Sequence, residues 1–367
     1  MYDIGRGKRA EKAYGLDDVA IVPTKRTRDI DDVDLTWKID AVTLDFPLIA
    51  APMDSIMSPD TVIEVGRLGG LGVLNLEGLW TRYEDPEPVL TQLAAITDPL
   101  AATRKLQQVY SAPIIPELID RRLGQIRAAG VPFAASLSPK NGRQHAEQVV
   151  AAGVDFLVIR GTTVSAQHVS STTDPLDLKR FIHDLDVPVI VGGCANYHTA
   201  LHLMRAGAAG ILVGFGGGAR RATRNVLGIE VPMATALSDA AAARGDYLDE
   251  SGGRYVAVIA DGSIGSSGDI AKAVACGADA AMVGVPFARA VEAPGAGYHW
   301  GPEAWHPTLS RGLRVHFDTI GSLEEILVGP SSVADGSMNL VGALKRTLAS
   351  TGFTDVKSFQ KAELVLV

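Results

Sequence analysis

Two glycine-rich segments in this chain have residue types that suit a phosphate group. Residues 213–224 read VGFGGGARRATR and residues 261–269 read DGSIGSSGD, and each segment follows an apolar run. Because glycine has no Cβ, backbone N–H groups in such loops can approach an anion closely. The second segment also leads into a helix, whose first N–H groups attract anions. Either segment alone fits a plain turn between a strand and a helix, but two on neighbouring loops favour a phosphate site.

The first segment also fits a degenerate dinucleotide-binding fingerprint through Gly214, Gly216 and Ala219. That fingerprint requires an acidic residue at the end of the next strand of an open sheet. Glu230 comes too early in the chain for this role. We therefore interpret the segment as a phosphate-binding loop and keep the dinucleotide fold as the alternative.

A recurring pattern indicates which elements carry these loops. Four helix-like stretches end in a glycine, at Gly130, Gly153, Gly207 and Gly277, and a short apolar run follows each of them. Glycine just past a helix adopts the left-handed conformation that closes the last turn. Apolar runs without alternation are typical of strands buried on both faces. Counting all such runs predicts eight strands, near residues 47–51, 71–75, 132–136, 155–160, 188–192, 210–213, 255–260 and 279–283.

Eight strands that alternate with helices predict an α/β fold, namely a (β/α)8 TIM barrel. A doubly wound open sheet is the alternative, but such a series would stop at five or six strands. We expect a single domain, with an N-terminal segment over 1–45, the barrel over 46–334 and a helical tail over 335–367. Residues 99–129 are expected to add extra helices. In such a barrel the ligand binds to the loops that follow the strands.

The composition narrows the possible classes of function. The 367 residues carry a formal net charge of −8, which argues against a nucleic-acid partner. Two cysteines are too few for a disulfide framework, and the histidine spacing predicts no metal site. The N-terminus lacks the apolar stretch of a secretory signal, and no apolar run is long enough to span a membrane. We expect a cytoplasmic protein.

Several stretches occur in the order that is typical of one enzyme family. They are YGLDDVAIVP (14–23), PLIAAPMDSIMSP (47–59), GGLGVLN (69–75), VIVGGCA (189–195), the segment 213–224, VIADGSIGSSGDIAKAVACGADAAMVG (258–284), EAPG (292–295) and GSLEE (321–325). Through them the sequence resembles the IMP dehydrogenase/GMP reductase family along nearly its whole length. The resemblance implies a homotetrameric barrel that binds a purine nucleotide 5′-monophosphate beside NAD, with a monovalent cation such as K⁺, in GMP biosynthesis. The regulatory CBS insert of some members is expected to be absent.

The same resemblance assigns roles to individual positions. Arg221 stands where the family has its nucleophilic cysteine, and Thr223 matches the catalytic threonine. Arg160 lies near the place of an aspartate that holds the cofactor's ribose, and Gly214 is expected on the cofactor side. The residues expected to contact the nucleotide are Met53, Cys194, Gly216, Gly218, Asp261, Gly262, Ser263 and Gly284. Because an arginine is not a nucleophile, the family's covalent chemistry is expected to be lost.

Two further residue types could contribute to the site. Cys194 ends the expected fifth strand, and a nearby Arg221 would favour its thiolate. A small buried cysteine is the favoured interpretation. Met53 likewise fits plain core packing as well as a purine contact. His299 lies in an aromatic segment that is expected to pack at a subunit contact, and Phe317 stands where the family has a tyrosine.

Three functions follow from these observations. The first is an IMP dehydrogenase-type oxidoreductase that acts on a purine nucleotide with NAD. The second is a nucleotide-binding pseudoenzyme or regulatory protein, because Arg221 replaces the nucleophile. The third is an oxidoreductase that acts on a different phosphorylated substrate, either through Cys194 or without a covalent step.

Overall fold

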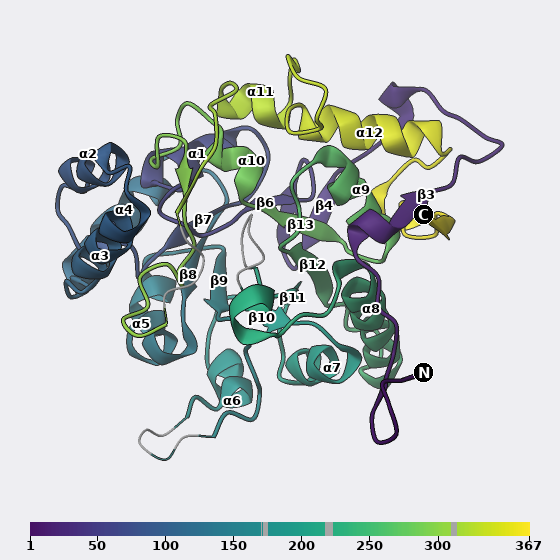
Figure 1. Ribbon diagram of the computed structural model, residues 1–367, viewed down its shortest axis with the longest axis horizontal. Helices are drawn as coiled ribbons and strands as arrows, with labels where there is room; N and C mark the ends of the chain where they lie inside the picture. Colours follow the sequence, from purple (N-terminus) through teal and green to yellow (C-terminus); the bar gives the residue numbers. More distant parts are fainter. Residues whose placement is uncertain (170, 172–174, 217–222, 310–313) are drawn as a thin grey trace.

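Eight parallel strands form one closed ring in this protein (Figure 1). The structure is a computed structural model, and it describes residues 1–169, 171, 175–216, 223–309 and 314–367. The strands of the ring are β6 (Leu48–Ala50), β7 (Gly72–Asn75), β8 (Phe133–Leu137), β9 (Phe156–Arg160), β10 (Val189–Cys194), β11 (Gly210–Val213), β12 (Ala257–Asp261) and β13 (Ala280–Val283).

Each strand of the ring pairs with the next one along the chain, and β13 pairs with β6. Two backbone hydrogen bonds then join β6 to the start of β7, from Ala50 N–H to Leu71 O (2.8 Å) and from Leu71 N–H to Leu48 O (3.1 Å). An open sheet has two unpaired edges, whereas this sheet has none. The predicted (β/α)8 barrel is therefore confirmed, and the doubly wound alternative is wrong.

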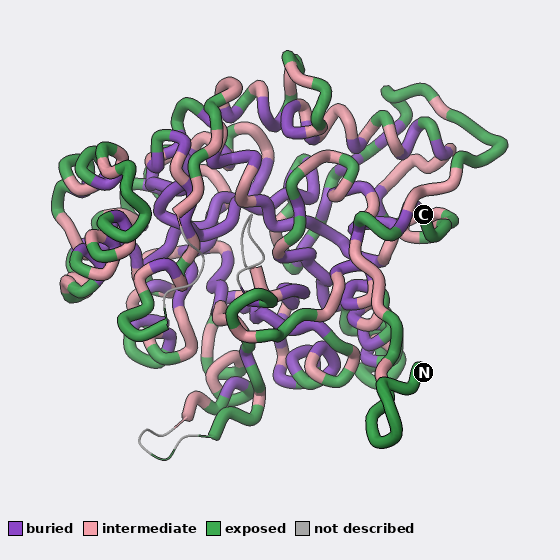
Figure 2. Tube along the Cα trace, in the orientation of Figure 1, coloured by how far each residue is buried: buried purple, intermediate pink, exposed green. Residues whose placement is uncertain are grey.

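Apolar and polar residues do not alternate along the strands because both faces of each strand are covered. Residues 156–159 of β9 are fully buried, and the same holds for residues 211–213 of β11. Figure 2 shows buried chain at the centre of the molecule and exposed chain around its rim. One face of each strand packs inside the barrel and the other packs against the helices outside.

Helices follow most strands of the barrel and cover its outside (Figure 1). They are α1 (Pro59–Arg67), α5 (Pro139–Ala151), α6 (Leu178–His183), α7 (Tyr197–Arg205), α8 (Met233–Glu250), α9 (Ser267–Ala275) and α10 (Val285–Ala288). Gly130, Gly153, Gly207 and Gly277 have φ angles of 70°, 82°, 105° and 112°. Their left-handed conformation confirms that the repeated glycine marks helix ends, and each such end lies directly before a strand.

Further helices extend the barrel. α2 (Glu87–Ala95), α3 (Pro99–Tyr110) and α4 (Pro116–Ala128) lie between β7 and β8, where extra helices are predicted. After α10 come the short hairpin β14 (Tyr298–His299) and β15 (Val315–His316), then α11 (Leu323–Leu327), α12 (Leu340–Ser350) and α13 (Val356–Phe359). The hairpin brings the side chain of His299 to the mouth of the barrel.

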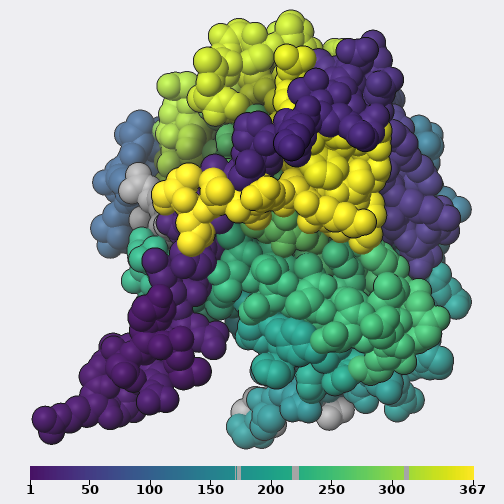
Figure 3. All heavy atoms as spheres, turned by 90° about the vertical axis from the view of Figure 1, so that its right-hand side faces the viewer, coloured from purple at the N-terminus to yellow at the C-terminus, as the bar shows by residue number. Residues whose placement is uncertain are grey.

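The two ends of the chain lie together on one side of the molecule. β3 (Val19–Ile21) pairs antiparallel with β16 (Leu364–Leu366). The hairpin of β4 (Trp37–Ile39) and β5 (Val42–Leu44) covers the N-terminal ends of the barrel strands, where Ile39 approaches Gly210 at the start of β11. The first hairpin, β1 (Tyr2–Asp3) with β2 (Arg9–Ala10), projects away from the body (Figure 3).

Candidate functional site

A cavity of about 540 Å³ opens at the C-terminal ends of the barrel strands. Its wall comes from the loops after β6, β11, β12 and β13 and from residues 15–18 of the N-terminal segment. The structure brings together six of the predicted site residues in this wall, namely Met53, Gly216, Asp261, Gly262, Ser263 and Gly284. A volume of this size accommodates a ligand as large as a mononucleotide.

The glycines of the two predicted phosphate loops allow the loops to touch each other through their backbones. Gly216 N–H donates to Asp261 O at 3.3 Å. A Cβ on Gly214 would lie 2.2 Å from Asp261 O, and a Cβ on Gly262 would lie 2.8 Å from Gly216 O. All three glycines have positive φ angles. No larger residue fits at Gly214 or Gly262 without moving the backbone of the other loop, so part of the glycine pattern serves the packing of the two loops against each other.

Several N–H groups at the start of α9 already have hydrogen-bond acceptors within the protein. The carboxylate of Asp269 accepts hydrogen bonds from the N–H groups of Gly265 (3.1 Å) and Ser266 (3.0 Å), and Ser267 N–H donates to Gly336 O (2.8 Å). These are donors that the sequence analysis assigned to a phosphate. A carboxylate at a helix N-terminus satisfies the same donors and the same helix dipole.

Other backbone donors for an anion lie directly after β12 and β13. Within the described residues, the backbone N–H groups of Ser263, Ile264 and Val285 donate no hydrogen bond. Ser263 has a φ of 58°, which turns the backbone sharply after β12. All three residues line the cavity. An anion bound here would lie between the loops after β12 and β13 rather than on the helix axis.

Asp261 and Arg160 form an ion pair across the mouth of the barrel. Arg160 Nε lies 3.1 Å from Asp261 Oδ2, and Arg160 Nη2 lies 3.4 Å from Oδ1. The two residues end β9 and β12, which are separated in the sheet by β10 and β11. A Cβ on Gly216 would lie 2.9 Å from Arg160 Nη2, so the loop passes closely over the guanidinium. The ion pair fixes the orientation of the carboxylate at the cavity wall.

After β11 the structure describes the loop to Gly216 and again from Thr223 onward. Gly218 and Arg221, which the family resemblance places at the reaction centre, lie outside the described residues. Thr223 is buried at the start of a short helical turn, Thr223–Leu227, and with Gly214 it lines a smaller cavity of about 50 Å³ beside the main one. Arg224 lines both cavities and pairs with Glu230, with Nε 3.2 Å from Oε2.

Cys194 ends β10 but does not belong to the wall of either cavity described above. Its side chain is buried, and its Sγ donates to Leu212 O at 3.5 Å. Burial raises the pKa of the Cys194 thiol to about 12. Thiolate formation is therefore suppressed, which argues against the hypothesis that Cys194 acts as a nucleophile.

His299 lies in the cavity wall, not in the surface contact where the sequence analysis expects it. It is 3% exposed, and its Nδ1 lies 3.2 Å from Ser55 Oγ in the loop after β6. Burial lowers the pKa of His299 to about 4, so the ring is neutral near pH 7. The chain offers no short-range signal for this position, because Ser55 and His299 are 244 residues apart.

A buried network of hydrogen bonds supports the loop that carries Met53. Asp54 Oδ2 accepts hydrogen bonds from Tyr110 Oη and from Leu79 N–H, and Trp300 Nε1 donates to Tyr110 Oη at 3.0 Å. Burial raises the pKa of Asp54 to about 6. These hydrogen bonds link the first loop of the barrel to α3 and to the segment after β14, so the Met53 side of the cavity rests on distant parts of the sequence.

Two further findings concern the described residues. They contain no group of three or more His, Cys, Asp or Glu side chains placed to hold a metal ion. None of the helices in this part of the chain combines the length and the apolar character that a membrane crossing requires.

Comparison with known proteins places these features in context. A family model described as the IMP dehydrogenase / GMP reductase domain matches residues 13–301. An uncharacterized oxidoreductase of Mycolicibacterium smegmatis is 51% identical over the full length of both chains. An inosine-5′-monophosphate dehydrogenase of Korarchaeum cryptofilum is 26% identical, over 78% of this chain and 77% of that protein. The crystal structure of an IMP dehydrogenase/GMP reductase-like protein from Corynebacterium glutamicum has a TM-score of 0.96 at 50% identity, covering 100% of this chain and 97% of that one.

Proposed function

Because this chain belongs to the IMP dehydrogenase / GMP reductase family, we propose that its cavity binds a purine nucleoside 5′-monophosphate such as IMP. One observation carries the proposal: the fold gathers six residues from four separate loops into the wall of a single cavity. All six are residues that the resemblance implies as contacts of the nucleotide.

Each part of such a ligand has matching chemistry in the wall. The unused N–H groups of Ser263, Ile264 and Val285 suit the phosphate. The carboxylate of Asp261 has lone pairs beyond those used by Arg160, and it suits the ribose hydroxyls. The thioether of Met53 offers a polarizable apolar surface to the purine.

The residues after β9 do not fit NAD in the way that the family resemblance implies. A ribose diol needs an acceptor there, and this chain has Arg160, whose guanidinium has five donors and no acceptor. That guanidinium is also paired with Asp261. The neighbouring Thr162 Oγ1 donates to Glu303 Oε1 at 2.8 Å. We therefore derive no hydride-transfer step, and we propose nucleotide binding without the family's covalent dehydrogenation.

An oxidoreductase that acts on a purine nucleotide is the second candidate. It is supported by family membership and by relatives of full-length similarity that are named oxidoreductases. A direct assay separates the two candidates. NADH formation from IMP and NAD above a protein-free blank supports the oxidoreductase, whereas saturable IMP binding without NADH formation supports the binding protein.

The binding proposal is tested by calorimetric titration of the full chain with IMP and GMP in a potassium buffer. We expect saturable binding, and we expect Asp261→Asn to weaken it about tenfold or more, because a charge-assisted hydrogen bond is lost. Asp249→Asn is the matched control, since Asp249 is exposed on the last turn of α8. Absence of binding to both nucleotides contradicts the proposal.

We further propose that the chain is one domain with the predicted boundaries and that it assembles as a homo-oligomer. The tail over 335–367 supports the single domain, because β16 pairs with β3 and thereby ties the two ends of the chain together. Family membership supports a tetramer. Sedimentation velocity of the full chain tests the assembly, and a monomer at micromolar concentration contradicts it.

A further inference from the structure

His299 is placed beside the anion donors of the cavity. Its Nε2 and Cε1 lie 3.7 Å from the point that a Cβ on Gly284 would occupy. Gly284 directly precedes Val285, whose N–H is one of the three unused donors. Since Gly284 has no side chain, the edge of the imidazole ring faces the same space as these donors. An anion that accepts a hydrogen bond from Val285 N–H would therefore lie next to His299.

We propose that His299 binds the phosphate group of the nucleotide, by donating a hydrogen bond from Nε2 as a neutral imidazole. This inference rests on the function proposed above and adds a specificity residue to it. None of the sequence stretches that carry the family resemblance includes His299. The inference therefore comes from the geometry of this chain.

Ser55 allows the neutral ring to act as a donor on the cavity side. Its hydroxyl accepts a hydrogen bond from Trp300 N–H at 3.3 Å, and it lies 3.2 Å from His299 Nδ1 and 3.3 Å from Trp300 O. When Ser55 donates to Nδ1, that nitrogen carries no proton, and the proton of the neutral ring is on Nε2. When Ser55 donates to Trp300 O instead, Nδ1 holds the proton. A rotation of one hydroxyl thus exchanges the two tautomers.

The surroundings of the ring favour the uncharged state in the absence of ligand. Ser55 is fully buried, and burial lowers the pKa of His299. The neighbouring Phe317, whose ring centroid lies 6.4 Å from that of His299, offers no polar atom. Met53, Gly284 and Val285, which line the cavity near His299, have no side-chain donor, so the imidazole can supply one there. A neutral donor adds direction to the backbone N–H groups without introducing a buried charge.

A thermodynamic cycle between the protein and the ligand tests the inference. The affinities of wild type, His299→Phe and His299→Gln are measured for IMP and for inosine, which lacks the phosphate. We expect His299→Phe to lower the ratio of IMP to inosine affinity about tenfold or more, because a hydrogen bond to a charged group is lost. His299→Gln keeps a donor and should retain most of the ratio. His316→Phe is the matched control, since His316 is exposed on the paired strand β15.

The outcomes distinguish the inference from the proposed function. If wild type binds IMP more tightly than inosine and His299→Phe keeps the same ratio, His299 does not contact the phosphate. If wild type does not bind IMP at all, the proposed function itself is wrong. If His299→Phe does not fold, ¹⁵N spectra of the eight histidines in wild type replace it. The signal that disappears in His299→Gln should then move with IMP but not with inosine, and a signal that IMP leaves unmoved overturns the inference.

Discussion

Two buried arginine–aspartate pairs lie at opposite ends of the barrel, and they differ in their other partners. Arg160 and Asp261 meet at the mouth, and Arg244 of α8 meets Asp279 just before β13, at the floor. The side chains are almost equally buried, with exposures of 10% and 6% at the mouth and 9% and 6% at the floor. Burial alone therefore does not separate a structural pair from a functional one.

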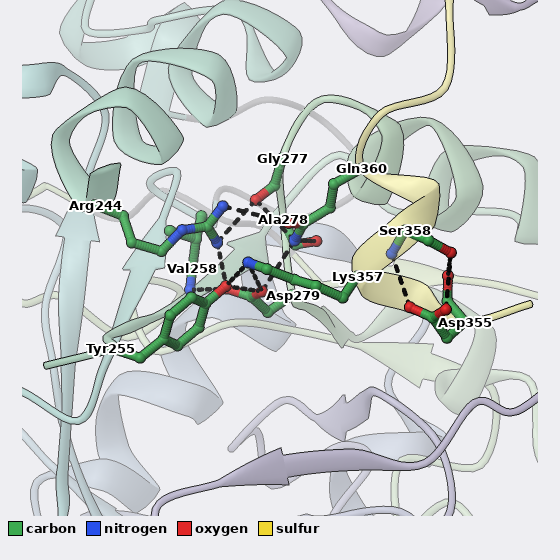
Figure 4. Close-up of polar contacts among 10 residues, drawn as sticks. All are labelled: Arg244, Tyr255, Val258, Gly277, Ala278, Asp279, Asp355, Lys357, Ser358 and Gln360. Atoms are coloured by element: carbon green, nitrogen blue, oxygen red, sulfur yellow. Dashed lines mark hydrogen bonds and ion pairs between the residues drawn. The ribbon is translucent and has the colours of Figure 1, made fainter. Parts of the chain in front are cut away.

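At the floor the carboxylate of Asp279 is fully used by the protein (Figure 4). Its Oδ2 accepts from Arg244 Nη1 and from Val258 N–H (2.8 Å), and its Oδ1 accepts from Tyr255 Oη (2.6 Å) and Gln360 Nε2 (2.9 Å). Gln360 also donates to Ala278 O, so the cluster ties the C-terminal segment to β13. Such a saturated carboxylate has little capacity left for a ligand.

At the mouth the carboxylate of Asp261 has one side-chain partner among the described residues, which is Arg160. It also faces the cavity. The comparison teaches that the number of satisfied lone pairs, not the depth of burial, indicates which ion pair can accept a ligand.

The largest expected effect is loss of the floor pair. Asp279→Asn leaves Arg244 buried without its counter-charge, and we expect the free energy of unfolding to fall by about 3–5 kcal/mol. Urea unfolding followed by circular dichroism measures it. Folded protein should still bind IMP as wild type does, since Asp279 is remote from the cavity. A loss below about 1 kcal/mol, the range of exposed pairs, would contradict the structural role.

A third carboxylate, Asp54, differs from both because it is buried without a paired arginine among the described residues. Its Oδ1 is buried without a hydrogen-bond partner among the described residues. Its pKa is raised by burial from 3.8 in the unfolded chain to about 6 in the folded one. Between these values the folded state binds more protons, so the stability that Asp54 contributes is complete below pH 4 and is lost as the pH rises through 6.

Asp54→Asn should remove that pH dependence. We expect the variant to be more stable than wild type at pH 8, by on the order of 3 kcal/mol, and to show no gain at pH 4. Thermal unfolding at pH 4, 6 and 8 measures the difference. Asp249→Asn, on the exposed end of α8, serves as the control. An equal effect of Asp54→Asn at all three pH values would show that Asp54 does not titrate in this range.

The mouth pair should contribute less to stability than the floor pair. Asp261→Asn leaves Arg160 next to a cavity that water can enter, so we expect a loss of about 1–2 kcal/mol in the free energy of unfolding, together with the loss of IMP affinity. The same urea experiment gives the value. If Asp261→Asn destabilises as much as Asp279→Asn and leaves IMP binding intact, the two ends of the barrel do not differ in the way inferred here.

The sequence predicts the barrel well because its signals are local. The glycines at 130, 153, 207 and 277 end helices, and the apolar runs after them are the strands. The sequence also places Met53, Asp261 and Gly284 at the cavity, since each lies at or shortly after the C-terminal end of a strand. The sequence does not predict the ion pair of Arg160 with Asp261, because no spacing rule indicates that the ends of β9 and β12 meet.

His299 was missed for the same physical reason. Its position depends on the pairing of β14 with β15 and on Ser55, which is contributed by the first loop of the barrel. The expectation of a subunit contact came from the aromatic residues around it, which suit packing in general, whereas His299 is buried in the cavity wall of its own chain. At the start of α9, Asp269 accepts from two of the N–H groups that were expected to bind a phosphate, as a capping residue does.

The smallest effect should come from the outermost member of the floor cluster. Lys357 Nζ donates to Tyr255 Oη and lies 3.9 Å from Asp279 Oδ1, and its side chain is 59% exposed. Because Asp279 already has four closer donors, and because solvent screens this cation, we expect Lys357→Met to change the free energy of unfolding by about 0.5 kcal/mol or less. Arg205→Met, which removes the exposed pair of Arg205 with Glu250, is the matched control. A loss as large as that of Asp279→Asn would mean that the floor carboxylate depends on this outer charge, and that its inner donors do not satisfy it.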